Sequence, residues 1–275
     1  MSESFGSRLG RAIAERSHLC VGIDPHPGLL AGWGLPDDAD GLRRFGTVML
    51  EAAVDRAAAI KPQVALYERH GSAGFAALEE LLARARELGV LSVADAKRGD
   101  IGSTMAGYGS AWLSDDSPLR SDSVTVSPYL GVGALAPAFD LARETGRGLF
   151  VLALTSNPDG ARVQHAGGAD SAAKRIVEDV AAANLAAGGS GLGYAGLVVG
   201  ATVGGDAQRL GIDLAAGAPP LLTPGYGAQG ATGEDLRRDL GHVWDQVLVP
   251  ASRSLAANGP DGVVAAVTAA AGDLG

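Results

Sequence analysis

Near the middle of the chain, several charged residues stand directly after an apolar run. Residues 90–94 are mostly apolar, and they are followed by Asp95, Lys97 and Asp100. An apolar run that ends in a loop predicts a buried strand, and because side chains alternate along a strand, Asp95 and Lys97 point to the same face. Burying opposite charges is costly unless they are paired. We therefore expect the end of this strand to be a place where chemistry occurs.

A further charged residue, Lys61, lies inside another apolar segment, AAAIKPQVAL. An ammonium group in such surroundings needs a partner of opposite charge, and Asp95 and Asp100 are candidates. A pair of structural salt bridges is the alternative interpretation of these residues. Because all four charged side chains stand at predicted strand ends, we favour an active site containing Lys61, Asp95, Lys97 and Asp100.

A glycine-rich segment and a later arginine predict a phosphate site. Residues 223–233 read TPGYGAQGATG, and a loop of this composition can direct backbone N–H groups toward an anion. Arg253 follows the last predicted strand, and its guanidinium can form bidentate hydrogen bonds to a phosphate. The segment is not a Walker loop, because no Gly-Lys-Ser/Thr follows it. An ordinary flexible loop is the alternative.

Several other catalytic motifs are missing from the sequence. Ser127 and Ser156 lack the G-x-S-x-G context of a hydrolase, and GLGYAG at 191–196 is not a dinucleotide motif at a strand-to-helix turn. The histidines show no metal-like spacing, so we predict no metal site and expect them on the surface or in loops. They are His18, His26, His70, His165 and His242.

The composition is that of a folded protein without a general surface for nucleic acid. The 275 residues are 47% hydrophobic and 19% charged, and the formal net charge is -9. No apolar run approaches the ~20 residues of a membrane span, and residues 1–17 lack the apolar core of a signal peptide. Cys20 is the only cysteine and lies in an apolar run, so we expect a buried thiol, no intrachain disulfide and a cytoplasmic location.

Apolar runs alternate with helical patterns along the chain. The runs predict strands at residues 19–23, 59–66, from 90 onward, 123–127, 148–154, 194–199, 220–223 and 246–250. Helices are predicted at residues 42–58, 73–88, 102–112, 134–144, 169–187, 206–210, 234–240 and 260–271, with Ser103 and Thr104 as candidate caps of the third. Residues 25–41 are predicted to be a Pro/Gly-rich loop, and residues 1–17 an N-terminal helical extension.

Eight strand–helix units predict an α/β protein with a single (β/α)8 TIM barrel over residues 1–275. A doubly wound open sheet is the competing architecture. Polar residues at the C-terminal ends of the predicted strands favour the barrel, because those ends meet at one mouth in a closed sheet. These residues are Asp24, Lys61, Asp95, Lys97, Ser127, Asn157, Thr202, Pro224 and Arg253.

The motif Asp95-x-Lys97-x-x-Asp100-Ile101, together with Asp24, Lys61 and Thr104, resembles the orotidine 5′-phosphate decarboxylase family. The longer segments ADAKRGDIGSTMAGY, SVTVSPYLG, LALTSNP and TPGYGAQG resemble its type 2 branch. The resemblance extends over roughly residues 19–255. It implies a (β/α)8 enzyme that converts orotidine 5′-monophosphate to UMP and CO2 in de novo pyrimidine synthesis, without a cofactor.

The resemblance also implies roles for the charged residues. Lys61, Asp95, Lys97 and Asp100 correspond to the family's alternating Lys-Asp-Lys-Asp array, with Lys97 as the proton donor. The last aspartate and a nearby threonine come from the partner subunit in the family. This implies that Asp100 and Thr104 serve the neighbouring site and that the enzyme is an obligate homodimer.

Further residues correspond to the family's substrate contacts. Asp24 and Lys61 resemble the residues that hold the ribose hydroxyls, and Ser127 stands near the expected pyrimidine site. Gln229 and Arg253 resemble the phosphate contacts, with the loop from Pro224 closing over the ligand. Ile101, Thr104, Pro224 and Gly225 complete the set of expected substrate-binding residues.

Elementary chemistry fits these roles. Loss of CO2 from C6 of orotate leaves a vinyl carbanion that no adjacent carbonyl delocalises. A fixed ammonium such as that of Lys97 can stabilise the developing charge and then donate a proton. Asp95 beside the substrate carboxylate would repel it. Two alternatives remain open, a metal-dependent sugar-phosphate lyase or aldolase on the same scaffold and a non-catalytic nucleotide-binding barrel.

Overall fold

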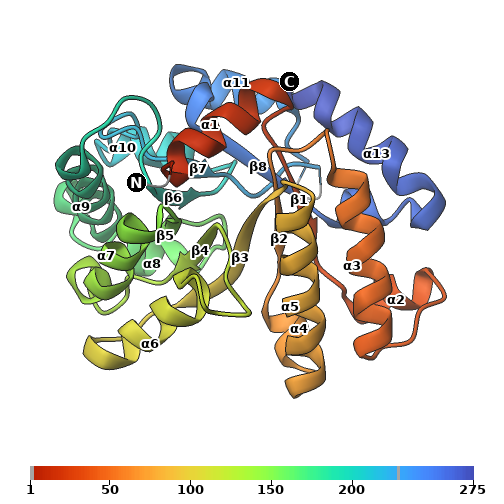
Figure 1. Cartoon of the computed structure of the whole chain (residues 1–275). Coiled ribbons are helices and arrows are strands. Elements are labelled where there is room, and N and C mark those ends of the chain that lie inside the picture. Colours follow the sequence, from red (N-terminus) through yellow and green to blue (C-terminus); the bar gives the residue numbers. More distant parts are fainter. Residues whose placement is uncertain (1–2, 228–229) are drawn as a thin grey trace.

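The apolar runs form a closed barrel of parallel strands (Figure 1). The computed structural model describes residues 3–227 and 230–275. Within these residues the strands pair in chain order, and β1 also pairs with β8, so the sheet has no open edge. The predicted (β/α)8 barrel is confirmed and the open sheet is excluded. The strands are β1 Leu19–Ile23, β2 Ala59–Pro62, β3 Leu91–Arg98, β4 Ser123–Val126, β5 Gly148–Leu154, β6 Ala195–Val199, β7 Leu221–Leu222 and β8 Val247–Ala251.

Helices surround the barrel and connect consecutive strands (Figure 1). No helix in the described part of the chain is long and apolar enough to cross a membrane. The α-helices are α1 Phe5–Glu15, α2 Pro27–Gly32, α3 Ala39–Ala53, α4 Ala65–Glu68, α5 Gly71–Glu87, α6 Gly102–Leu113, α7 Ala136–Thr145, α8 Gly160–Gln164, α9 Ala172–Ala187, α10 Gly204–Arg209, α11 Gly233–Leu240, α12 Arg253–Ala256 and α13 Gly259–Leu274. The 3-10 helices are η1 Val132–Leu135, η2 Gly168–Asp170 and η3 Gly241–Gln246.

Some predicted boundaries were wrong. The segment 25–41 is not all loop, because α2 begins at Pro27, where the fixed φ of proline suits a first helical turn. β2 ends at Pro62 rather than residue 66, since Val64 already has helical dihedrals and precedes α4. Neither Ser103 nor Thr104 caps α6. Its N-cap is Ile101, which makes no side-chain capping bond.

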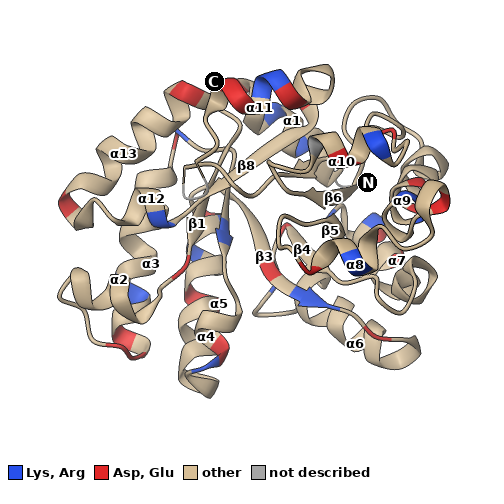
Figure 2. Cartoon of the chain, turned by 180° about the vertical axis from the view of Figure 1, so that it is seen from behind, with Lys and Arg blue, Asp and Glu red and all other residues tan. Residues whose placement is uncertain are grey.

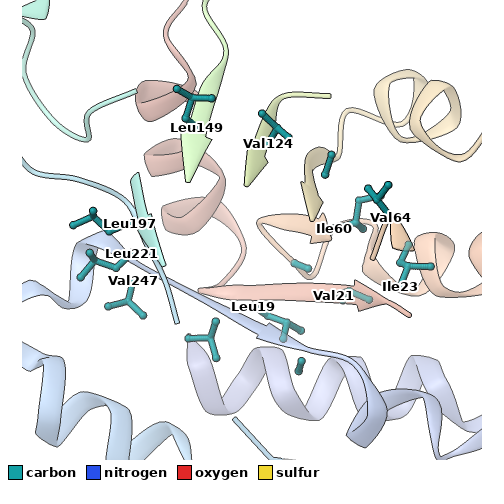
Figure 3. Close-up of a cluster of buried hydrophobic side chains, with 14 of the residues drawn as sticks. Leu19, Val21, Ile23, Ile60, Val64, Val124, Leu149, Leu197, Leu221 and Val247 are labelled. Carbon is teal, nitrogen blue, oxygen red and sulfur yellow. The ribbon is translucent and has the colours of Figure 1, made fainter. Parts of the chain in front are cut away.

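The barrel strands are buried on both faces, one toward the surrounding helices and one toward the barrel interior. Figure 3 shows the apolar side chains that point outward from the strands, where the surrounding helices cover them, among them Leu19, Ile60 and Val124. The other face forms a second cluster, in which Cys20 and Val93 pack with Phe5 and other residues of α1. Because side chains alternate along a strand, the inward series continues from Cys20 to residue 24, from residue 59 to 61, and from Val93 to residue 95. The charged residues therefore continue the inner face of the barrel.

Of two buried polar side chains outside the predicted site, Cys20 agrees with its prediction and His18 does not. Cys20 is buried as expected, and burial raises the pKa of its thiol to about 12. His18, by contrast, is 7% exposed rather than a surface residue. Its Nδ1 lies 2.8 Å from the carbonyl oxygen of Val247, and its ring packs on Trp244 with 4.3 Å between centroids.

Candidate active site

Asp95 stands between two ammonium groups at the mouth of the barrel. Its Oδ2 accepts a hydrogen bond from Lys61 Nζ at 2.9 Å, and its Oδ1 accepts one from Lys97 Nζ at 2.5 Å. The side chains of Asp95 and Lys61 are 10% and 9% exposed, whereas that of Lys97 is 46% exposed. Figure 2 shows acidic and basic segments following each other along β3. The structure thus brings together three of the four residues predicted as catalytic.

Two neutral side chains complete the surroundings of Asp95. Thr125 Oγ1, from β4, donates to Asp95 Oδ1 at 3.0 Å. With its amide nitrogen facing Asp95, Gln63 donates to Oδ2 at 3.1 Å and to the main-chain oxygen at 2.9 Å. Both carboxylate oxygens therefore have a charged and an uncharged donor, which holds the group in one orientation. Sequence reasoning missed Thr125 and Gln63, because their partner is distant in the chain.

Lys97 lies at an irregularity of β3. The register between β3 and β4 shifts between Ala94 and Arg98, as at a β-bulge, and Lys97 has φ +49°. A positive φ is unusual for a residue with a Cβ and costs free energy unless neighbouring contacts fix it. One such contact is the N–H of Lys97, which donates to Thr125 Oγ1 at 2.9 Å. A single threonine hydroxyl thus contacts both the Lys97 backbone and the Asp95 carboxylate.

The electrostatics of the site keep its charged forms stable. Burial opposes ionisation of Asp95, but the ammonium groups of Lys61 and Lys97 outweigh it and lower the pKa of Asp95 well below its usual range. Burial likewise opposes charging of Lys61, yet Asp95 and Asp24 raise the pKa of Lys61 above its usual value. At neutral pH the buried part of the site is therefore an ion pair.

Asp24 follows β1 and faces the same site from the other side of Lys61. Its Oδ1 lies 3.9 Å from Lys61 Nζ. That oxygen is buried and has no hydrogen-bond partner within the described residues. A buried, unpartnered carboxylate oxygen beside an ammonium can accept a hydrogen bond from a ligand hydroxyl. This geometry suits the sugar hydroxyl contact that was predicted for Asp24 and Lys61.

Asp100 and Ile101, just before α6, and Thr104, in its first turn, do not join the array of their own chain. Asp100 Oδ1 accepts a hydrogen bond from the N–H of Ile101 at 2.8 Å. Among the described residues, Asp100 forms no ion pair with Lys61 or Lys97. Ile101 is 61% exposed, and Thr104 is also exposed.

Ser127 follows β4 and lies beside the end of β3. Its N–H donates to the carbonyl oxygen of Arg98 at 2.8 Å. The close approach requires glycine at position 99, because a Cβ there would lie 2.4 Å from the Ser127 carbonyl oxygen. The half-buried Ser127 is thereby placed near Lys97 at the barrel mouth.

The predicted phosphate residues follow β7 and β8, which are neighbours in the barrel. Pro224 is half-buried, and its carbonyl oxygen accepts from the N–H of Ala201 at 2.9 Å. Gly225 is buried with φ +139°, and Arg253 is exposed at the start of α12. Gln229 lies outside the described residues. The structure therefore places Pro224, Gly225 and Arg253 at the same end of the barrel as Asp95.

A closed (β/α)8 barrel with a charged array at the carboxyl ends of its strands has the architecture of an enzyme. The sequence profile of the orotidine 5′-phosphate decarboxylase / HUMPS family matches residues 17–269, and the chain belongs to this family. The orotidine 5′-phosphate decarboxylase of Salinispora arenicola is 56% identical over 271 residues, which are 98% of this chain and 95% of that protein. The Streptomyces coelicolor enzyme of the same name is 55% identical over 98% of this chain and 95% of its own length.

Solved structures agree with these relatives. A Streptomyces avermitilis protein, provisionally assigned as an orotidine 5′-phosphate decarboxylase, superposes with a TM-score of 0.93 at 50% identity and covers 99% of this chain and 95% of its own. The Leishmania donovani OMP decarboxylase gives a TM-score of 0.79 at 29% identity, over 98% of this chain and 97% of its own. The chain is accordingly a decarboxylase, which is a carbon–carbon lyase.

Proposed function

We propose that this chain decarboxylates orotidine 5′-monophosphate to UMP and CO2 in de novo pyrimidine synthesis, without a cofactor, as a member of the type 2 subfamily. The observation that carries the proposal is the Asp95 carboxylate held between the Lys61 and Lys97 ammonium groups at the barrel mouth. The names of the Salinispora arenicola and Streptomyces coelicolor relatives point to the same reaction.

Lys97 is the proton donor in this proposal. When CO2 leaves C6, the electron pair of the broken bond stays on that carbon, and a nearby ammonium stabilises it. Transfer of a proton from Nζ to C6 then completes UMP and leaves a neutral amine, which solvent reprotonates. Partial exposure of Lys97 suits this role, because its ammonium is directed to the open mouth while Asp95 restrains it.

Asp95 and Lys61 prepare the site for this step. The Asp95 carboxylate orients Lys97 and faces the leaving carboxylate of the substrate, so their repulsion is relieved as CO2 departs. Lys61 keeps Asp95 ionised despite its burial. Thr125 and Gln63 fix the carboxylate, so little reorganisation is needed in the transition state.

The remaining residues bind the substrate in this proposal. Asp24 and Lys61 receive the ribose hydroxyls, and Ser127 lies beside the pyrimidine. Binding energy from the distant phosphate contributes to catalysis when it positions C6 against Lys97. Ile101 contacts the substrate as well, and the phosphate contacts are Pro224, Gly225, Gln229 and Arg253.

We further propose that two copies share their active sites in a cytoplasmic homodimer, with residues 1–275 of each forming one domain. Asp100 and Thr104 then complete the site of the partner. Exposed apolar side chains support an interface at this position, because Ile101, Tyr129 and Leu130 are 61%, 81% and 55% exposed and follow the neighbouring strands β3 and β4. Groups of large exposed apolar side chains are characteristic of protein interfaces.

Formation of UMP from orotidine 5′-monophosphate after exhaustive treatment with EDTA tests the reaction. The proposal predicts undiminished turnover in the chelated enzyme. A metal-dependent sugar-phosphate lyase would instead lose activity with EDTA and recover it with Mg2+. Within the described residues, no group of three or more His, Cys, Asp and Glu side chains is arranged to hold a metal ion.

A further inference from the structure

The last turn of α13 contacts the loop that follows β7. The Asp273 Oδ2 atom accepts a hydrogen bond from the hydroxyl of Tyr226 at 2.9 Å and another from the N–H of Gly233 at 3.0 Å. These two donors lie at either end of the segment 226–233, and 40 or more residues separate them from Asp273 in sequence. One carboxylate oxygen therefore fixes both ends of this segment. Figure 1 shows the C-terminus beside α11, at the place where the segment ends.

The fit between Gly233 and Asp273 is close. A Cβ at position 233 would lie 2.8 Å from Asp273 Oδ2 and 2.6 Å from its main-chain oxygen, so only glycine allows this contact. Thr232, the residue before Gly233, forms a capping box with Asp235 at the start of α11. The end of the segment is thus fixed both to α13 and to its own helix.

The start of the segment is fixed as well. The N–H of Gly227 donates to the carbonyl oxygen of Ala231 at 2.9 Å, and an isolated bridge pairs Tyr226 with Ala231. Burial and the adjacent Asp273 raise the pKa of Tyr226 to about 12, so its hydroxyl remains a donor at neutral pH. Pro224 and Gly225, expected at the phosphate, directly precede Tyr226.

The end of α13 that carries Asp273 is itself held by α11 and by the residue before β1. Arg237 donates to the main-chain oxygens of Asp273 at 2.8 Å and of Gly275 at 2.6 Å. Leu274 is fully buried, and its carbonyl oxygen accepts from the N–H of His18 at 3.4 Å. The end of α13 is therefore a fixed point from which a side chain can position the loop.

We propose that Asp273, acting through Tyr226 and the Gly233 N–H, is a positioning residue that holds residues 224–227 and 230–233 in place for binding of the substrate's phosphate beside Pro224 and Gly225. This inference rests on the proposed function, which places the phosphate beside Pro224, Gly225 and Arg253. Backbone that is already held in place on either side of an anion site loses less conformational entropy when the anion binds. Loss of the anchor then weakens binding of the phosphate group and leaves contacts to the base and sugar unchanged.

The direct test compares a nucleotide with the matching nucleoside. Tyr226→Phe removes the hydroxyl without changing charge, and Asp273→Ala removes the acceptor for both ends. We expect the Kd for UMP and the KM for orotidine 5′-monophosphate to rise about tenfold in either variant, the order expected for one hydrogen bond to a charged acceptor. The Kd for uridine, measured by ligand-observed NMR, and kcat should change less than about twofold, as expected when ground-state and transition-state binding fall equally.

Asp261→Asn is the matched control, because it removes a negative charge from the first turn of the same helix. It should leave the Kd for UMP unchanged. An unchanged Kd for UMP in Tyr226→Phe overturns the proposal, and so does an equal weakening for UMP and uridine, which is the mark of a general structural role. If the wild-type protein forms no UMP, the proposed function is wrong, yet selective loss of UMP affinity in the variants would still support the anchor.

Discussion

Asp95 is the residue on which the site is built. Its carboxylate is nearly buried and receives hydrogen bonds from Lys61, Lys97 and Thr125. Buried charges are stabilising only when partners satisfy them, and here the partners also point Lys97 toward the open mouth. In the proposed mechanism, this pairing of charges orients Lys97 as the proton donor.

Thr125 is expected to act on catalysis through its hydroxyl. Thr125→Val keeps the shape of the side chain but leaves the Lys97 N–H and one Asp95 oxygen without this partner. We expect kcat to fall about 10- to 100-fold, which corresponds to losing one or two hydrogen bonds in the transition state. Thr125→Ser retains the hydroxyl and should remain within about threefold of wild type. Steady-state kinetics with both variants test this, and a valine variant with wild-type kcat contradicts it.

At the scale of elements, the end of β3 requires close packing against β4. Gly99→Ala introduces a Cβ 2.4 Å from the Ser127 carbonyl oxygen, so we expect a loss of about 1–3 kcal/mol in the free energy of unfolding. Gly28→Ala is the control, since a Cβ at this exposed position in α2 meets nothing within 4 Å. Urea unfolding should show that the control is as stable as the wild type. Equal stability of both variants would contradict the packing argument.

His18 lies where η3, β8 and β1 meet, and its burial predicts that the stability of the protein depends on pH. Burial lowers the pKa of His18, whose Nδ1 faces the Val247 carbonyl oxygen. The folded pKa is below the unfolded value of about 6.5, so the unfolded state binds the proton more readily and stability falls as pH drops below about 6.5. The free energy of unfolding is therefore expected to be lower at pH 5.5 than at pH 7.5, with His18 contributing to the difference.

Urea unfolding of the wild type and of His18→Gln at both pH values measures this contribution. The glutamine variant can still donate to Val247 and does not titrate, so its stability should depend less on pH. A wild type and variant with the same pH dependence would show that His18 contributes nothing.

Sequence patterns predicted the bounds of a strand best where the whole strand is one apolar run. The strands at residues 19–23 and 148–154 have the predicted bounds, because each is one uninterrupted apolar run. The predicted strand at 59–66 failed at its end, since apolar residues after Pro62 belong to α4 and pack as a helix. Apolar character alone does not tell a strand from a buried helix turn.

The charged residues of the site could be predicted from the sequence, but the uncharged residues that bind the Asp95 carboxylate could not. Lys61, Asp95 and Lys97 were recognisable because charge in an apolar run is unusual. Thr125 and Gln63 are ordinary residues in the sequence, and only the pairing of β2, β3 and β4 brings them to Asp95. His18 was misplaced for the same reason, since closure of the barrel next to β8 buries it.

The whole molecule gathers these residues because the barrel closes. Closure places β1, with Asp24 after it, between β2 and β8, so that residues distant in sequence share one mouth. Asp100 remains outside the array of its own chain and lies near the exposed Ile101, which agrees with a site completed by a second copy.

A shared site predicts complementation between two inactive proteins. When Lys97→Ala and Asp100→Ala proteins are mixed in equal amounts and exchange subunits, half of the dimers are mixed, and each mixed dimer has one intact site. We expect about one quarter of wild-type activity from the mixture, following the two-fold symmetry of such a dimer. If no mixture recovers activity, Asp100 acts within its own chain.

The central claim is that Lys97 supplies the proton, and kinetics of Lys97→Ala test it most directly. The measurement is kcat for orotidine 5′-monophosphate together with the Kd for UMP. We predict a fall in kcat of at least about a thousandfold, with the Kd for UMP within about tenfold of wild type, because the variant loses the general acid and keeps the phosphate and ribose contacts. Unchanged turnover in Lys97→Ala would contradict the mechanism.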